Sequence, residues 1–448
     1  MRETPGIAHT NPGDDMESLW MNQMKLPTFE PLRQDLKTDV LIIGGGLAGV
    51  LCAWQLARDG VNYALIEADR VCGGVTGFTT AKITVQHGLI YDKLIRKFGA
   101  EKAQMYLQAN QAALREYRGL CRKIDCEFEE QDAYVYSREQ ISRLEDEVIA
   151  LEELGCRADF MRHTGLPFQV EGAVRLPNQA QFHPLKFVAG IVPGLNVYEK
   201  TKALAYEGNH TVLTTGGRIR AEKIIVATHF PIFNKHGSYF LKLYQQRSYV
   251  LALENALKPE GMFISDHEKG LSFRSSGDLL LLGGGSHRTG KQGGNWEELS
   301  DFAKRHYPDA QEKYRWATQD CMSLDGVPYI GQYSASTSDL YVATGFNKWG
   351  MTSAMASALL LRDLVQGREN EWAPIFSPSR TMLRPQLLVN GFEAAVNLLT
   401  PAKPRCPHMG CALKWNAAEH TWDCSCHGSR FTETGKLINN PATDDLKQ

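Results

Sequence analysis

The sequence lacks any uncharged apolar run long enough to cross a lipid bilayer. Its first residues, Met1 to Ser18, are polar and acidic, so the basic-then-apolar pattern of a secretory signal is missing there as well. These absences predict a protein without a membrane span. We expect it to be cytoplasmic.

An excess of either charge is also absent. The 49 lysines and arginines nearly balance the 51 aspartates and glutamates, which leaves a formal net charge of −2. This balance gives no electrostatic reason to expect nucleic acid as a partner. Repeats of solenoid or propeller length and low-complexity segments are missing too, which excludes repeat architectures. The partners we expect are small molecules and other proteins.

What the chain does have is length and apolar content, since its 448 residues are 43% hydrophobic and can fill more than one core. Its 10 cysteines are unevenly spread. Most stand singly, which is typical of a reducing compartment, but four fall between Cys406 and Cys426. This cluster predicts a bound cofactor.

A glycine-rich turn lies between an apolar strand, DVLIIGGG, and an amphipathic helix. Gly44, Gly46 and Gly49 form the pattern GxGxxG, which permits a tight turn, close approach to a pyrophosphate and close helix–strand packing. The helix N-terminus then faces the phosphates. Glu67 ends the next expected strand, where a carboxylate either accepts the hydroxyls of a ribose or is a solvated surface acid. The unit predicts dinucleotide binding and leaves NAD and FAD both open.

Four further segments carry a resemblance to a known family. They are GVTGFTTAK, IIVATHFP, LDGVPYIG and ATGFNKWGMT, at residues 74–82, 224–231, 324–331 and 343–352. With the glycine turn they resemble the FAD-dependent amine and amino-acid oxidases, a family that includes glycine, sarcosine, D-amino-acid and γ-glutamylputrescine oxidases. The resemblance covers roughly residues 37–372 and implies noncovalently bound FAD. The further cofactor-binding residues that it implies are Thr79, Thr80, Ala81, Lys82, Ala203, Thr228, Gly331, Gly345, Asn347, Lys348, Trp349, Gly350, Met351 and Thr352.

Lys348 lies in a glycine-bracketed turn before a helix rich in small residues. There it either adds positive charge near flavin N1 and O2, which favours the anionic reduced state, or is an exposed turn lysine. Arg247 and Tyr249 lie on an expected strand, where the arginine either pairs with a substrate carboxylate or lies at a strand edge on the surface. His229 and His287 are candidates for acid–base chemistry, but a lone histidine is more often structural, and we assign no general base.

Two short boxes near the C-terminus, CPHMGC and CSCHGS, combine cysteine with histidine. Two cysteines and two histidines with such small gaps also make a zinc site, but six potential ligands in two matching boxes favour a cluster. The boxes resemble the two ligand loops of Rieske proteins. That resemblance implies a [2Fe–2S] cluster, with one iron held by cysteines and the other by histidines. The implied ligands are Cys406, His408, Cys424 and His427, and the implied disulfide joins Cys411 and Cys426.

The resemblance to Rieske proteins also has limits. Ser429 matches a residue that hydrogen-bonds a cluster sulfur, but Phe431 stands where high-potential members have a tyrosine that donates to a ligand sulfur. Without that donor we expect a low potential. The proline-rich linker, with one short helix near residues 391–399, leads almost directly into Cys406, so the β-base looks shortened. We expect a trimmed module that lies against the flavin domain.

The expected fold is α/β: a Rossmann-like FAD-binding domain with an inserted antiparallel-sheet substrate domain, then a small all-β Rieske-like module. A leader at residues 1–37 precedes the oxidoreductase at 38–372. The FAD-binding parts are about 38–90, 195–231 and 318–372, and the substrate-domain parts are about 91–194 and 232–317. A linker at 373–404 connects them to the module at 405–448.

Three functions fit these features. In the first, a CH–N bond of an amine or amino acid is oxidised, and electrons pass from FAD through the cluster to an unidentified acceptor. The second is an electron-transfer flavoprotein that has no organic substrate. The third is a flavoprotein whose C-terminal boxes hold a structural zinc ion. We prefer the first.

Overall fold

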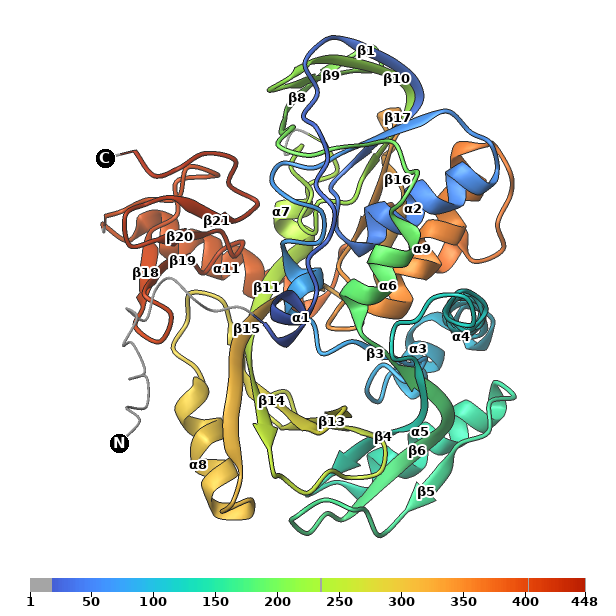
Figure 1. The fold of residues 1–448 in the computed structure, drawn as a ribbon, viewed down its shortest axis with the longest axis vertical. Helices are drawn as coiled ribbons and strands as arrows, with labels where there is room; N and C mark the ends of the chain where they lie inside the picture. Colours follow the sequence, from blue (N-terminus) through green and yellow to red (C-terminus); the bar gives the residue numbers. More distant parts are fainter. Residues whose placement is uncertain (1–17, 234–235, 402, 448) are drawn as a thin grey trace, which may run out of the picture.

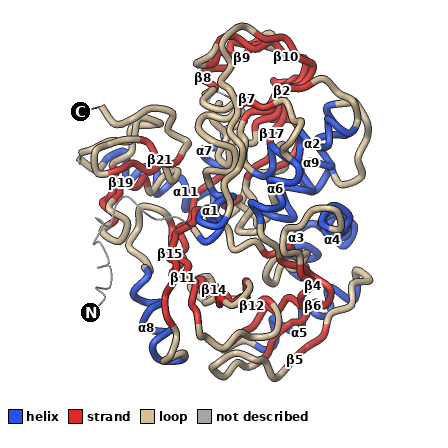
Figure 2. Tube along the Cα trace, viewed as in Figure 1, coloured by secondary structure: helices blue, strands red, loops and turns tan. Residues whose placement is uncertain are grey.

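The computed structural model describes residues 18–233, 236–401 and 403–447. Figure 1 shows three parts: a sheet flanked by helices at the top, a second sheet at the bottom, and a small sheet at the left formed by the end of the chain. Figure 2 shows how helices and strands are distributed over these parts. The expected α/β fold is therefore confirmed, including the all-β module at the C-terminus.

The first sheet has eight strands, five of which run parallel to their neighbours in the order β17-β10-β1-β2-β7. Along β1, Val40 and Ile42 face one hydrophobic cluster and Leu41 and Ile43 face another. Both faces are thus covered, as the continuous apolar run predicts. The strands are β1 (Leu36–Ile43), β2 (Tyr63–Ile66), β7 (Val197–Tyr198), β8 (Ala203–Gly208), β9 (Thr211–Thr214), β10 (Gly217–Val226), β16 (Tyr329–Ser334) and β17 (Thr337–Thr344).

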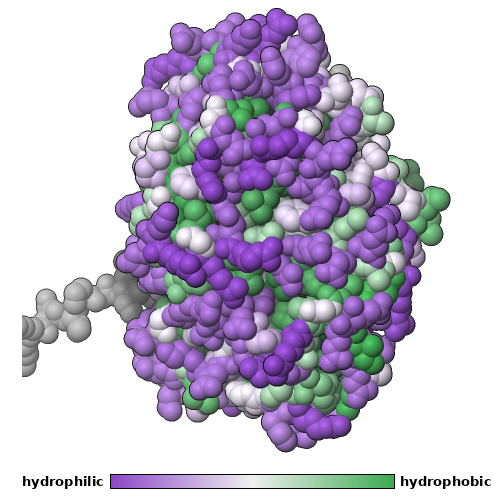
Figure 3. Space-filling view, turned by 90° about the vertical axis from the view of Figure 1, so that its right-hand side faces the viewer, coloured by the Kyte–Doolittle hydropathy of each residue, from purple (hydrophilic) through white to green (hydrophobic). Residues whose placement is uncertain are grey.

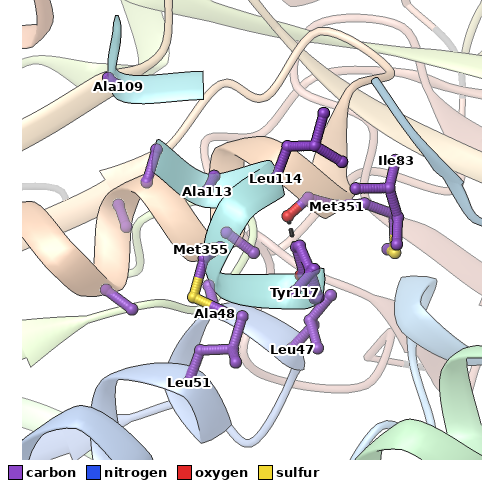
Figure 4. Close-up of a cluster of buried hydrophobic side chains, with 14 of the residues drawn as sticks. Leu47, Ala48, Leu51, Ile83, Ala109, Ala113, Leu114, Tyr117, Met351 and Met355 are labelled. Atoms are coloured by element: carbon purple, nitrogen blue, oxygen red, sulfur yellow. Dashed lines mark hydrogen bonds between the residues drawn. The ribbon is translucent and has the colours of Figure 1, made fainter. Parts of the chain in front are cut away.

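Two helices, α2 (Leu47–Arg58) and α9 (Gly350–Val365), pack against each other beside this sheet. Small residues such as Ala354 and Ala358 let them approach closely. In Figure 4, Tyr117 of α4 (Ala100–Cys121) lies over both helices, and its hydroxyl donates to the carbonyl of Met351 at 2.9 Å. This contact fixes the N-terminal end of α9.

The second sheet has nine strands and is antiparallel except where β12 runs parallel to β4. Two of its strands, β3 and the end of β15, lie in ranges that the sequence assigns to the FAD-binding domain. The strands are β3 (Lys82–Ile83), β4 (Glu129–Ser137), β5 (Asp159–Met161), β6 (Gly172–Gln181), β11 (Leu243–Glu254), β12 (Met262–Ser265), β13 (Ser272–Ser276), β14 (Leu279–Arg288) and β15 (Gln311–Ser323).

Shorter helices connect and cover the sheets. They are α1 (Leu19–Gln23), the 3-10 helix η1 (Val75–Phe78), α3 (Tyr91–Phe98), α5 (Ile141–Glu153), α6 (Pro184–Ile191), α7 (Tyr239–Lys242) and α8 (Trp296–His306). Trp20 of α1 is fully buried, and its Nε1 donates to the carbonyl of Thr79 at 2.7 Å. The described end of the expected leader is therefore packed against the oxidoreductase.

The expected linker contains more helix than the sequence predicts. After α10 (Ala373–Phe376), α11 spans Pro385–Leu399, whereas only residues near 391–399 were expected to be helical. Pro385 occupies the first turn, where a missing N–H costs nothing, so it begins the helix rather than breaking it. The third sheet follows, with strands β18 (Leu413–Asn416), β19 (Thr421–Cys424), β20 (Arg430–Thr432) and β21 (Leu437–Asn439).

Among the described residues, no helix combines the length and the hydropathy that a membrane crossing requires. The face in Figure 3, which is the right-hand side of Figure 1, is mostly hydrophilic with scattered apolar patches.

Candidate active site and cluster loops

A cavity of about 1080 Å³ lies between the first and second sheets. Its wall includes Gly44 and Gly46 of the glycine turn and, from the second sheet, Ser248 and Tyr249. Asn440 of the C-terminal module also lines it. All three parts of the fold therefore meet at one cavity large enough for a cofactor and a small substrate.

The glycine turn is sterically restricted. Gly44 has φ +108°, and a Cβ there would lie 2.7 Å from the carbonyl oxygen of Ala227. A Cβ on Gly49 would lie 1.9 Å from the carbonyl oxygen of Gly44, so only glycine lets α2 approach β1 this closely. Gly46 is the N-cap of α2 and offers no capping side chain. The helix N-terminus is thus open toward the cavity, as a phosphate site requires.

Glu67 lies just after β2 and lines the cavity. Its Oε2 accepts from the N–H of Gly45 at 2.7 Å, and its Oε1 accepts from the N–H of Asp69 at 2.8 Å. Burial raises the pKa of this carboxyl, and the two backbone donors oppose that effect. Each oxygen retains a further lone pair, so the group fits the hydroxyls of a ribose.

Most residues expected at the flavin do line the cavity: Gly44, Gly46, Glu67, Thr79, Thr80, Lys82, Ala203, Thr228, Gly345, Lys348, Trp349, Gly350 and Met351. Five others lie outside its wall: Gly49, Ala81, Gly331, Asn347 and Thr352. Gly331 lies on β16 against Pro378, and Thr352 is bonded to His87 and Thr84. The Asn347 Oδ1 accepts from the N–H of Ser323 at 2.8 Å, which holds the turn between β17 and α9 against the end of β15.

Lys348 projects into the cavity with its Nζ bonded to the hydroxyl of Ser286 at 2.8 Å. It is therefore not an exposed turn lysine. Burial lowers its pKa, and the nearby carboxylate of Asp320 opposes that effect. Asp320 also lines the cavity, and burial raises its pKa to about 6 although Lys348 and Arg247 act against the shift. No sequence pattern points to Asp320, because one aspartate within a strand resembles any surface acid.

Lys82 is a second cation in the cavity wall. Burial, together with the positive charge of Arg274, lowers its pKa to about 7. Arg274 is itself buried and donates to the carbonyls of Thr80 and Ala81 at 2.8 and 2.9 Å. This guanidinium fixes the backbone of the two residues that precede Lys82.

Arg247 does not line the cavity, so the expected contact with a substrate carboxylate is wrong. Its guanidinium is buried against Glu419 of the C-terminal module, with Nε 2.7 Å from Oε1. Alternation along β11 explains this, because Ser248 faces the cavity and its neighbour Arg247 faces away. Tyr249 does line the cavity, although its ring is buried against Trp296.

Of the two candidate histidines, only His229 lines the cavity. Its Nε2 is 3.2 Å from Oε1 of Gln245, and burial lowers its pKa to about 4. His287 is bonded through Nδ1 to the carbonyl of Gly285 at 3.0 Å. Both therefore have structural partners, consistent with the absence of an assigned general base.

The two cysteine–histidine boxes come together at one end of the third sheet. The Nδ1 atoms of His408 and His427 are 3.2 Å apart. Two nitrogen ligands at about 2.1 Å from one tetrahedral metal ion would be about 3.4 Å apart. Burial lowers the pKa of His408 to about 4 and that of His427 to about 3, so both are neutral, as metal ligands must be.

The four cysteines of the boxes form one disulfide and one pair of free thiols. Cys411 and Cys426 form the predicted disulfide, and Cys406 and Cys424 are free and buried. Hydrogen bonds from the Cys424 thiol, the backbone and the Ser429 hydroxyl lower the pKa of Cys406 to about 7. This favours the thiolate that binds iron, and the Ser429 contact agrees with the expected bond to a cluster sulfur.

Polar contacts hold the module on the flavin domain. Gln245 donates to the carbonyl of His427 at 2.8 Å, and Arg288 donates to the carbonyls of Ser425 and Cys426 at 2.9 and 3.1 Å. Glu419, besides its pair with Arg247, accepts from Arg430 at 2.8 Å. Asn440 of the module also donates to the carbonyl of Phe230, in the FAD-binding part, at 3.0 Å, so the expectation of a module lying against the flavin domain is confirmed.

Phe230 lies between the cavity and the cluster loops. It follows Thr228 and His229, which line the cavity, and it is fully buried. Its ring centroid is 6.3 Å from that of His408 and 6.1 Å from that of His427. Phe230 therefore connects the backbone of the cavity wall, at Thr228 and His229, to the rings of the two histidines.

This fold and this pair of sites define a flavoprotein with an attached Rieske module, and the comparisons agree. The family model "FAD dependent oxidoreductase" matches residues 39–364, and "Rieske [2Fe-2S] domain" matches residues 397–448. The chain belongs to the FAD-dependent oxidoreductase family and carries a C-terminal Rieske domain. Its cofactors are accordingly FAD and a [2Fe–2S] cluster.

One relative shares the whole arrangement. The putative Rieske 2Fe-2S iron-sulfur protein YhfW of Bacillus subtilis is 36% identical over 96% of this chain and 97% of that protein. The gamma-glutamylputrescine oxidoreductase of Escherichia coli is 22% identical over 77% of this chain and 87% of its own length. The structure of glycine oxidase from Geobacillus kaustophilus has a TM-score of 0.64 at 19% identity, covering 78% of this chain and all of that one, which shows the shared fold.

Proposed function

We propose that the protein oxidises a CH–N bond of an amine or amino acid at the cavity and passes the two electrons, one at a time, through its own Rieske cluster to an external acceptor. FAD supplies a two-electron acceptor for the hydrogen next to nitrogen, and the [2Fe–2S] cluster supplies a one-electron outlet. Hydrolysis of the resulting imine completes the reaction. The observation that carries this proposal is the placement of Phe230 between the cavity wall and both histidines.

The residues at the dinucleotide end bind and orient the cofactor. The N–H groups around Gly44 and Gly46 receive the pyrophosphate, and Glu67 receives the ribose. Lys348 keeps positive charge beside the redox-active ring system, held in place by Ser286. The glycine turn thus binds the pyrophosphate, the end of β2 binds the ribose, and the turn before α9 places a positive charge at the ring system.

At the substrate end, Asp320 is the group that recognises the amine. Its pKa of about 6 leaves it ionised near neutral pH, and it lies beside Lys348 in the cavity wall. A carboxylate there hydrogen-bonds a substrate N–H and orients the adjacent carbon. Arg247 is bonded to Glu419 and does not line the cavity. Near Asp320, the described part of the cavity wall therefore has no arginine that could bind a substrate carboxylate through two hydrogen bonds. This favours amines over simple amino acids.

At the module, Cys406 and Cys424 hold one iron and His408 and His427 the other. Gln245 links this loop to the cavity wall, because its Nε2 donates to the carbonyl of His427 while its Oε1 is bonded to His229, which lines the cavity. The ion pair of Arg247 with Glu419 is buried on the same interface. Because the module is held in one position, the distance that electrons travel between the FAD and the cluster stays constant.

Anaerobic titration of the purified protein with amines and amino acids tests this function. We expect an amine to bleach the flavin absorbance and then to produce the electron paramagnetic resonance signal of a reduced Rieske centre. Bleaching by NADH alone, with no response to any amine, would instead indicate an electron-transfer flavoprotein. Zinc in place of iron and acid-labile sulfide would refute the electron path.

A further inference from the structure

Exposed apolar side chains are concentrated in one short part of the chain. Of the large hydrophobic residues that are exposed in the described ranges, only Ile149, Leu204, Leu257 and Ile438 lie outside residues 383–415. Those inside that segment are Leu383, Leu388, Val389, Phe392, Val396, Leu398, Leu399, Met409 and Trp415. An apolar patch of this kind on an otherwise polar protein indicates a binding surface.

Helix α11 is responsible for most of this patch, and its orientation is inverted. Leu388, Phe392 and Leu399 are 77%, 69% and 82% exposed, whereas Asn390 and Asn397 are buried. A helix that only packs on a protein in water turns its apolar face inward. The opposite arrangement implies that the outer face of α11 has an apolar environment of its own.

The buried polar face prevents the helix from rotating. The Oδ1 of Asn390 accepts from Arg288 at 2.9 Å, and its Nδ2 donates to the carbonyl of Leu241 at 3.2 Å. Glu393 is ion-paired with Lys291 at 2.7 Å. Turning the leucines inward would leave these groups buried without partners, so the apolar face stays outward.

The charged residues of the segment that contains the helix are, with one exception, positive. Between residues 373 and 416 the only acidic residue is Glu393, which is paired inward with Lys291. The basic residues of the segment are Arg380, Arg384, Lys403, Arg405 and Lys414, of which Arg380 is bonded to buried Asp325. The apolar face is thus accompanied by unopposed positive charge, although the whole chain has a formal net charge of −2.

We propose that the outer face of α11 binds the surface of an anionic membrane. Apolar side chains enter the boundary between headgroups and acyl chains, and flanking lysines and arginines attract acidic lipids. A second copy of the chain would cover the same leucines, but it would bring the cations of both copies together. Because Ala412 donates to the carbonyl of Asn397 at 3.0 Å and both residues are buried, the module that carries the cluster loops contacts the inner face of the bound helix. This surface is independent of the reaction at the cavity.

Co-sedimentation of the full-length holoprotein with vesicles tests the proposal. Vesicles of phosphatidylcholine alone are compared with vesicles that also contain phosphatidylglycerol. We expect binding to the anionic vesicles that weakens as salt is raised. The variant L388Q/F392Q is expected to lose at least tenfold in binding, and K403Q/K414Q to weaken binding to anionic vesicles only.

The matched control is I149Q/L257Q, which replaces two exposed apolar residues elsewhere and should bind like the wild type. Flavin and iron content and circular dichroism establish that each variant is folded. The proposal would be overturned if L388Q/F392Q and K403Q/K414Q both bound anionic vesicles as strongly as the wild type does. A wild-type protein that does not bind anionic vesicles at low salt would also overturn it. In that case, a dimer that is detected by sedimentation velocity and is lost in L388Q/F392Q would show that the face binds a second copy of the chain.

Discussion

All predicted cluster ligands lie between Cys406 and His427, whereas the wall of the flavin cavity includes residues as distant in sequence as Ile43 and Asp445. The cluster loops depend on side chains that bind metal. The dinucleotide end of the cavity depends on backbone groups and on the absence of side chains at the glycine turn. The cluster site is therefore lost when one ligand side chain is removed. The dinucleotide site is instead lost when a side chain is added to one of its glycines.

The largest effect is expected at the cluster loops. Replacing Cys406 with alanine removes one predicted iron ligand, and the protein should be purified without the [2Fe–2S] cluster but with its FAD. Iron and acid-labile sulfide analysis, together with the flavin spectrum, measures both. Cys156→Ala, which removes a free cysteine far from the boxes, should leave both cofactors in place. A full complement of iron in the Cys406 variant would contradict the ligand assignment.

The corresponding change at the flavin cavity is Gly49→Ala. Its Cβ would lie 1.9 Å from the carbonyl oxygen of Gly44, so the turn must shift and the bound flavin should fall severalfold. The FAD-to-protein ratio after gel filtration measures this. A Cβ at Gly119 of α4 meets no atom within 4 Å, so Gly119→Ala should retain full flavin. Equal flavin in the two variants would show that the turn does not hold the cofactor.

The interface between the two regions should be sensitive to Arg247→Met. Removing one partner of this buried ion pair leaves Glu419 with Arg430 alone, at a cost of about 3 kcal/mol in the free energy of unfolding. Denaturant unfolding measures the change. The exposed pair of Arg218 and Glu207 provides the control, because Arg218→Met should change the free energy of unfolding much less than Arg247→Met does. Similar costs for the two variants would mean that the module is not held by this pair.

The same ion pair gives a pH dependence. Burial raises the pKa of Glu419, but the charges and hydrogen bonds of Arg247 and Arg430 outweigh that effect and lower it to about 2 from an ordinary value of 4.5. A depressed pKa contributes stability above pH 4.5 that is lost as the pH falls toward 2. In Arg247→Met the folded pKa rises, so acid unfolding should begin at a higher pH than in the wild type.

Within the cavity, Lys348→Met should slow flavin reduction by the substrate by about tenfold or more, because a fixed positive charge beside the ring system is lost. Stopped-flow absorbance measures the rate, and Lys348→Arg should restore part of it. The cluster spectrum should be unchanged. An unaltered rate in the methionine variant would exclude Lys348 from flavin tuning.

The smallest effect is expected from Phe431→Tyr. Phe431 is fully buried in the module, and a tyrosine hydroxyl there would add a donor toward the cluster sulfurs and raise the reduction potential. A redox titration of the reduced-cluster signal measures the shift. A lower or unchanged potential would show that the hydroxyl has no sulfur within reach.

The sequence predicted the parts of the site that are local. The chemistry of the glycine turn is readable from its spacing. The cluster ligands, the disulfide and the lysine before α9 lie in short segments whose resemblance to known families implies their roles. Asp320 was missed because its role appears only when β15 is placed beside the cavity. Arg247 was misassigned because its partner Glu419 is distant in sequence, and no local pattern tells which face of a buried strand meets another domain.

The linker was misjudged for a similar reason. Its prolines suggested irregular structure, but Pro385 lies in the first turn of α11 and Gly391 is tolerated within the helix. Asn390 is buried there by its contacts with Arg288 and Leu241, neither of which is near it in sequence. The inverted face of this helix emerged only from those tertiary contacts.

The most direct test of the link between the two centres is rapid mixing of the oxidised protein with a reactive amine under anaerobic conditions, followed by freezing at successive times. The flavin absorbance and the paramagnetic signal of the cluster are read from the same samples. If electrons pass by way of Phe230, the cluster signal will appear as the flavin reacts and at a rate independent of protein concentration. A flavin that is fully reduced while the cluster stays oxidised, or a concentration-dependent rate, would contradict transfer within one chain.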